Sequence, residues 1–187
     1  MSLLTPVRML ISSEDGWDEL ARSHPSPAAS FGKVVLPASL LSSAMIVYAA
    51  YFHGEVYAPA VPFRQWCYVA LLFLLVSWLC VPLMGYVIRH SVRSTRPLAY
   101  RDCYRLAAIA PLPIWLSALT LMVPSPLFNL LAGVTGLFAS AGLILHGLDA
   151  LFEHDHWVRT LSVTYTVFSV GALLWALVIG LLVLPLL

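Results

Sequence analysis

The sequence predicts an all-α, polytopic membrane protein built as a bundle of five transmembrane helices. Of its 187 residues, 60% are hydrophobic and only 10% are charged, whereas a soluble domain has about 25% charged residues. Several apolar runs approach the length of about 20 residues that a helix needs to cross roughly 30 Å of hydrocarbon. The chain has ten Lys and Arg residues and nine Asp and Glu residues, so it lacks the large excess of positive charge that attracts nucleic acid. The expected solvent is lipid, and nucleic acid is excluded as a partner.

Apolar length and its interruptions place the five spans at residues 34–52, 66–88, 106–123, 127–146 and 163–184, within one domain over residues 33–187. Only Pro-Ser-Pro at 124–126 separates the third span from the fourth, which predicts an antiparallel hairpin. Residues 1–32 form a cytoplasmic or interfacial segment with short helices, since Thr5-Pro6 is a helix start and Ser12 with Asp15 resembles a capping box. This segment is either a membrane-surface or partner-binding arm, or an ordered lid on the bundle.

Prolines predict kinks in the second and third spans. Pro82 lies in the second span, and Pro111 and Pro113 lie in the third. Each removes a backbone donor where no water can replace it, so the freed carbonyl groups need other partners or a cavity. Such kinks mark binding sites in some membrane proteins and merely bend the helix in others. The simple bend is favoured because no charged residue lies deep in a span.

The distribution of basic residues predicts the orientation. Nine of them fall on the side of the N-terminus and only Arg64 falls on the other. The nine are Arg8, Arg22, Lys33, Arg89, Arg93, Arg96, Arg101, Arg105 and Arg159. Because positively charged loops stay on the cytoplasmic side, we expect the N-terminus in the cytoplasm and the C-terminus on the opposite side.

Small residues at four-residue spacing line one face of each of the last two spans. They are Ala132, Gly136 and Ser140 in the fourth span and Ala172, Ala176 and Gly180 in the fifth. Helices in lipid associate by close packing at such residues. We therefore expect helix contacts at these faces, within the bundle or between copies of the chain.

A polar cluster follows the fourth span and could hold a metal. His146, Asp149 and Glu153 share a helix face at offsets of three and seven. They could bind a divalent ion such as zinc, with His156 or water as a fourth ligand. No named metal motif is present, and a solvated helix end explains the cluster equally well, so we expect no cofactor and keep the metal as a hypothesis.

The basic connection between the second and third spans has two interpretations. Its arginines could hold anionic lipid headgroups, each contributing about 1 kcal/mol, or they could act as a topology signal alone. The arginines concerned are Arg89, Arg93, Arg96, Arg101 and Arg105. The sequence contains no nucleophile elbow, phosphate-binding loop or paired intramembrane carboxylates, which argues against an enzyme.

Three short motifs follow one another along the chain: GWDEL at 16–20, AAIAPLP at 107–113 in the third span, and LHGL at 145–148 at the end of the fourth. These motifs and their order resemble those of the Yip family, the Ypt/Rab-GTPase-interacting membrane proteins, in its bacterial branch. The resemblance to the bacterial branch implies a five-helix protein of the inner membrane, in which the C-terminus placed outside by the basic residues would be periplasmic. The family has no established catalytic residues to transfer. His146 replaces the Tyr or other neutral residue that members often carry there, which leaves a metal or partner site of this chain's own open.

The preferred function is therefore a non-enzymatic scaffold or accessory subunit that contacts membrane lipids and either a membrane-protein partner or further copies of itself. The first alternative is a transporter or lipid-handling protein that uses a cavity at the Pro82 and Pro111 kinks. The second alternative is a metal-dependent membrane enzyme.

Overall fold

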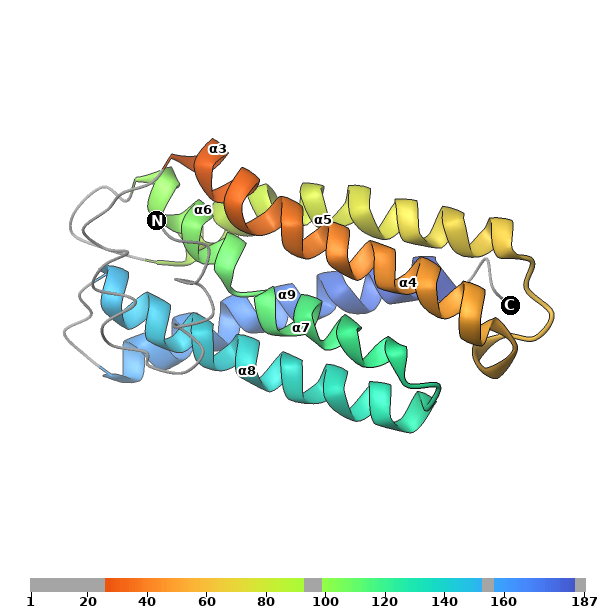
Figure 1. The fold of residues 1–187 in the computed structure, drawn as a ribbon. Helices are drawn as coiled ribbons and strands as arrows, with labels where there is room; N and C mark the ends of the chain where they lie inside the picture. Colours follow the sequence, from red (N-terminus) through yellow and green to blue (C-terminus); the bar gives the residue numbers. More distant parts are fainter. Residues whose placement is uncertain (1–25, 93–98, 153–156, 184–187) are drawn as a thin grey trace.

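The computed structural model describes residues 26–92, 99–152 and 157–183, and within these ranges every regular element is a helix. Figure 1 shows long helices packed side by side in an elongated bundle. In chain order the elements are α3 (Pro27–Ser30), the π-helix η1 (Phe31–Val35), α4 (Leu36–Tyr57), α5 (Phe63–Ser91), α6 (Tyr100–Ile109), α7 (Leu112–Ser117), the 3-10 helix η2 (Ala118–Met122), α8 (Pro126–Phe152) and α9 (Trp157–Val183).

Four helical segments in the described part of the chain are long and apolar enough to cross a membrane. They are Pro27–Tyr57, Phe63–Ser91, Tyr100–Met122 and Pro126–Asp149. The predicted class, an all-helical membrane protein, is thereby confirmed. Helix α9 has 27 residues, of which the stretch Ser162–Leu177 forms a shorter apolar helix.

The first helical segment begins at Pro27, seven residues before the expected onset at residue 34. Its start is set by Ser26, whose hydroxyl oxygen accepts a hydrogen bond from the Ala29 N–H at 3.2 Å. Pro27 occupies the first helical position, where a missing N–H costs no hydrogen bond. The helix therefore includes residues assigned from sequence to the N-terminal segment, while residues 1–25, with their expected short helices, lie outside the described residues.

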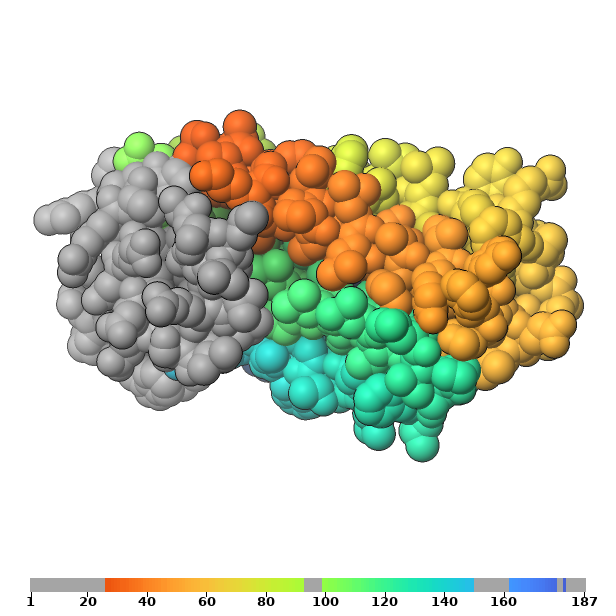
Figure 2. All heavy atoms as spheres, viewed as in Figure 1, coloured from red at the N-terminus to blue at the C-terminus, as the bar shows by residue number. Residues whose placement is uncertain are grey.

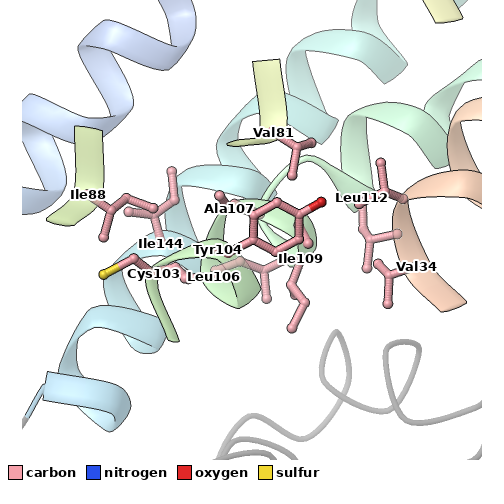
Figure 3. Close-up of a cluster of buried hydrophobic side chains, with 14 of the residues drawn as sticks. Val34, Val81, Ile88, Cys103, Tyr104, Leu106, Ala107, Ile109, Leu112 and Ile144 are labelled. Atoms are coloured by element: carbon pink, nitrogen blue, oxygen red, sulfur yellow. The ribbon is translucent and has the colours of Figure 1, made fainter. Parts of the chain in front are cut away.

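The interior of the bundle is centred on α6. All residues of α6 from Cys103 to Ile109 are buried. Figure 3 shows Val81 and Ile88 of α5 and Ile144 of α8 around the side chains of α6. Glycine allows one of these helices to approach closely: a Cβ at Gly85 of α5 would lie 3.2 Å from the Cα of Tyr104.

Large apolar side chains also cover the outside of the bundle. Leu79 of α5 is 68% exposed, and Leu127 and Phe138 of α8 are 67% and 72% exposed. Figure 2 shows one face of the molecule, with α4 crossing it between α5 and the pair α7 and α8. Apolar surface of this extent is unusual for a soluble monomer, whereas it suits helices whose outer faces contact lipid.

Candidate functional site at the helix break

The helix of the third span is interrupted at Ala110 and Pro111. Helix α6 ends at Ile109, a turn follows, and α7 begins at Leu112. Because Pro111 and Pro113 have no N–H, the carbonyl groups four residues earlier, of Ala107 and Ile109, receive no helical hydrogen bond from them. Helix α5, by contrast, continues through Pro82 without interruption, and the Tyr100 hydroxyl donates to the Pro82 carbonyl at 3.1 Å.

Helix α8 packs directly on the backbone of this break. An ideal Cβ at Gly136 would lie 2.9 Å from the Pro113 carbonyl oxygen and 3.2 Å from the Cα of Ile114. These are backbone atoms, which cannot rotate away as a side chain can. Glycine is therefore needed at position 136 to seat α8 against α7.

A side chain of α4 supports the backbone after the break. At the start of the 3-10 turn Ala118–Met122, the Trp115 carbonyl accepts a backbone hydrogen bond from the Ala118 N–H, and its second acceptor position is used by α4. The Ser42 hydroxyl lies 2.9 Å from that carbonyl oxygen and 3.0 Å from the Ala38 carbonyl oxygen. The break is thus held by α4 on one side and by α8 on the other.

A cavity of about 80 Å³, here called cavity A, lies beside the break among α5, α6, α7, α8 and α9. Most of its lining is apolar, including Val81, Pro111 and Ile144. Trp115 and Ser140 also line it and are 1% and 4% exposed. Among the described residues, neither the Trp115 Nε1 nor the Ser140 Oγ has a hydrogen-bond partner. A buried donor without a partner costs about 1–3 kcal/mol, so an acceptor that reached either of these two groups would be stabilising.

A second cavity of about 210 Å³, here called cavity B, lies beside η2. Its lining includes Ser42, Ser117, Thr120 and Asn129. The Asn129 Oδ1 is buried and has no hydrogen-bond partner within the described ranges.

The amide nitrogen of Asn129 is held in place by a network at the edge of cavity B. The Asn129 Nδ2 donates to the Tyr57 hydroxyl oxygen and, at 3.2 Å, to the Val123 carbonyl oxygen. The Tyr57 hydroxyl in turn donates to the same Val123 carbonyl at 3.1 Å. The Asn129 side chain is therefore fixed through its amide nitrogen.

The small-residue faces are placed differently on the two helices. On α8, Gly136 and Ser140 are buried and Ala132 is half-buried. On α9, Ala172 lines cavity A, whereas Ala176 and Gly180 are exposed.

The basic connection is only partly described, because Arg93 and Arg96 lie outside the described residues. Arg89 and Arg101 are exposed. Arg105 is only 2% exposed, and its guanidinium lies 3.6 Å from the Asp102 carboxylate one helical turn earlier. Its side chain is therefore inside the bundle rather than at the headgroup surface.

The polar cluster after the fourth span is also partly described, since Glu153 and His156 lie outside the described residues. His146 and Asp149 are exposed, and the His146 Nδ1 lies 2.8 Å from the Gly142 carbonyl oxygen. If Nδ1 carries the proton in this contact, Nε2 is the nitrogen left for a ligand. In the part of the chain that the structure describes, no three His, Cys, Asp or Glu side chains come together as a metal site would require.

Sequence reasoning did not single out Trp115, Ser42 or Asn129. A signal was present: each is a polar or amphipathic side chain inside an apolar segment, and Trp115 comes two residues after Pro113. A proline break creates unpaired backbone groups, so polar side chains close to it in the sequence are candidates to pair with them.

Comparison with known proteins identifies the family. The Yip1 domain matches over residues 7–184, which include every helix described above. Comparisons with curated proteins and with solved structures give no match. The family match covers nearly the whole chain and agrees with the resemblance of its short motifs, so the chain belongs to the Yip1 domain family.

Proposed function

We propose that the chain crosses the bacterial inner membrane five times, with its N-terminus in the cytoplasm and its C-terminus in the periplasm. Helix α9 has 27 residues, more than the roughly 20 needed to cross the hydrocarbon. Figure 1 shows the starts of α3, α6 and α9 at one end of the bundle. The exposed Arg89 and Arg101 belong to that end, and Arg64 belongs to the other. The charge asymmetry supports this orientation.

Within that membrane, the function we favour is a non-enzymatic scaffold or accessory subunit. The observation that carries it is the face of α9 formed by Ala176 and Gly180, which is exposed. An ideal Cβ at Gly180 would meet nothing within 4 Å in the described part of the chain. On α8 the corresponding small residue, Gly136, is already used against Pro113. We infer that this α9 face, which is uncovered within the described ranges, seats a helix of a partner or of a second copy.

Co-purification in mild detergent tests the scaffold function. The full chain, carrying an affinity tag, is expressed in its own membrane together with a second copy carrying a different tag. Replacing Ala176 and Gly180 by Leu should abolish recovery of the partner or of the second copy. The matched control is Gly133→Leu on α8, a position where an added Cβ also meets nothing within 4 Å in the described residues. Equal recovery with both variants would refute a docking role for the α9 face.

A second candidate function, handling of a lipid, is favoured by a separate observation. Cavity A lies at the helix break, and two residues of its lining, Trp115 and Ser140, each carry a buried donor without a hydrogen-bond partner in the described residues. An apolar cavity with a few convergent polar groups is the usual form of a small-molecule site. Native mass spectrometry of the purified chain, after exchange into lipid-free detergent and addition of defined lipids, should detect a bound lipid. If every lipid tested is lost at the lowest activation energy, this candidate is excluded.

A further inference from the structure

Cavity A lies at the middle of the long helices that form its walls. Ser77 is the middle residue of α5, and Ser140 and Gly171 come directly after the middle residues of α8 and α9. All three residues line the cavity. The two leaflets of a bilayer meet at the middle of its roughly 30 Å of hydrocarbon, which is where acyl chains end. Cavity A therefore lies at the depth of the chain ends.

Helices α5 and α9 contact each other at two levels beside this cavity. At one level the Phe73 ring packs on the Trp175 ring, with ring centroids 5.7 Å apart. At the other level an ideal Cβ at Gly171 would lie 3.6 Å from the terminal methyl carbon of Met84. Trp175, Gly171 and Met84 all line cavity A. These two contacts set the spacing of the helices, so the side chains between them determine whether the interval is filled.

Small side chains leave that interval unfilled. Cys80 of α5 and Ala172 of α9 lie between the two contacts along their helices, and both line cavity A. Both residues are half-buried, whereas Ile88 and Val167, which also line the cavity, are each 1% exposed. The cavity is therefore closed at the level of Ile88 and Val167, and its wall reaches the outer surface between α5 and α9, where the bundle contacts lipid.

The lining and the volume of cavity A indicate what can enter there. In the described part of the chain, the lining contains no Asp, Glu, Lys, Arg or His residue. A cavity with apolar walls excludes water and accepts an apolar ligand. Its volume is about 80 Å³, and one water-sized group needs about 10–15 Å³, so the cavity has room for roughly six groups of that size. That space fits the last few carbons of one acyl chain and is too small for a whole lipid.

We propose that cavity A takes the terminal segment of one acyl chain of a bilayer lipid, which enters sideways between α5 and α9. The lipid headgroup stays outside the bundle, so the hydrocarbon is recognised and the headgroup is not. This inference rests on the lipid-handling function and adds the part of the lipid that is bound and the route by which it enters.

Photolabelling of the full chain in phosphatidylcholine vesicles tests the proposal. Two phosphatidylcholine probes carry a photoactivatable diazirine, one at the end of an acyl chain and the other next to the ester. Trp115 and Ser140 line cavity A and are only 1% and 4% exposed, so lipid around the bundle does not reach them. We expect peptide mapping by mass spectrometry to find both residues modified by the chain-end probe and unmodified by the ester probe. If neither probe modifies them, or both modify them equally, the proposal is overturned.

Matched pairs of variants locate the entry route. Cys80→Phe places a ring in the space of the chain end and should reduce labelling of Trp115 by roughly tenfold, whereas Leu79→Phe, at a neighbouring position that is 68% exposed, should leave it unchanged. Ala172→Phe and Leu173→Phe, the latter at a position that is 65% exposed, repeat the comparison on α9. Thermal unfolding in detergent shows which variants fold, and the α9 pair decides if Cys80→Phe does not. Undiminished labelling in a folded cavity variant would refute the route.

Native mass spectrometry with defined lipids separates this site from the lipid-handling function itself. If a lipid is retained while Trp115 and Ser140 stay unmodified, the chain-end site is wrong and lipid handling stands. If no lipid is retained and neither residue is modified, the lipid-handling function is removed as well.

Discussion

Replacing Gly136 by Ala should weaken the bundle at the point where α8 meets the helix break. The added Cβ would lie 2.9 Å from the Pro113 carbonyl oxygen and 3.2 Å from the carbonyl carbon of the same residue. Since both atoms belong to the backbone, relief requires α7 or α8 to move as a whole. Overpacking of this kind typically costs about 1–3 kcal/mol.

A control on the same helix separates this contact from the effect of Ala on helix formation. At Gly133 an added Cβ meets no atom within 4 Å among the described residues. Any Gly-to-Ala change in a helix gains up to about 1 kcal/mol in propensity, and both variants share that gain. The difference between them therefore isolates the contact, and we expect Gly136→Ala to be less stable than Gly133→Ala by about 1–3 kcal/mol.

The assay is reversible unfolding of the full chain in mixed micelles with increasing sodium dodecyl sulfate, followed by circular dichroism. Gly136→Leu should lose more stability than Gly136→Ala, because a larger side chain needs a larger displacement of α7. If Gly136→Ala and Gly133→Ala unfold at the same detergent composition, the packing argument at the break is wrong.

Two further predictions concern single contacts, and a third concerns the metal hypothesis. Ser42→Ala should lower the unfolding free energy by about 0.6 kcal/mol, and by at most about 1.7 kcal/mol, the range for hydrogen bonds between membrane helices, since the Trp115 carbonyl loses its hydrogen bond from α4 and keeps the one from the Ala118 N–H; a loss no larger than that of Thr135→Ala, whose hydroxyl bonds within its own helix, would contradict this. Gly85→Ala should cost about 1 kcal/mol because its Cβ would lie 3.2 Å from the Tyr104 Cα, whereas Gly171→Ala would meet only the mobile end of Met84 at 3.6 Å; equal stability of the two variants would count against the α5–α6 contact. For the metal hypothesis, we expect equilibrium dialysis with zinc to leave the parent and the His146→Ala/Glu153→Ala double variant equally low in bound metal, and a stoichiometric ion lost in the double variant would establish the site instead.

The sequence was sufficient for the fold class because hydrocarbon imposes one dominant constraint. Apolar length alone predicted helical spans, and Pro-Ser-Pro at 124–126 predicted the turn before α8, which begins at Pro126. The limits of the helices were harder to predict, since a helix continues past the hydrocarbon until its caps end it. Ser26 and Pro27 carry that information for the first segment, and they precede the apolar run by several residues.

Of the candidate site, only the features that depend on single residues, such as the prolines of the third span, could be predicted from the sequence. Pro111 and Pro113 predict a kink in the third span, because a missing N–H is a property of the residue itself. The position of Arg105 was not predictable in the same way: α6 begins at Tyr100, so Arg105 lies inside the helix, one turn from Asp102 and buried. The burial of Arg105 depends on which helices surround α6, and the residues near Arg105 in the sequence do not predict that packing.

The cavities could not be predicted from the sequence. Cavity A needs side chains from α5, α6, α7, α8 and α9 at once. Nothing in the local sequence distinguishes Trp115 and Ser140. Their polar groups are buried and without a hydrogen-bond partner in the described residues only because of how the helices pack around them. The sequence shows that Trp115 and Ser140 are polar groups in apolar spans. Only the tertiary structure shows that both residues line the same cavity.

The orientation of the bundle in the membrane is the claim on which the account depends most, and substituted-cysteine accessibility tests it most directly. Cys67, Cys80 and Cys103 are first replaced by Ala, and single cysteines are then introduced as Arg64→Cys and Arg89→Cys, at exposed positions near opposite ends of α5. With a membrane-impermeant maleimide, intact spheroplasts should label position 64 at once and position 89 only after the membrane is permeabilised. Labelling of position 89 in intact spheroplasts, or of both positions alike, would contradict the account.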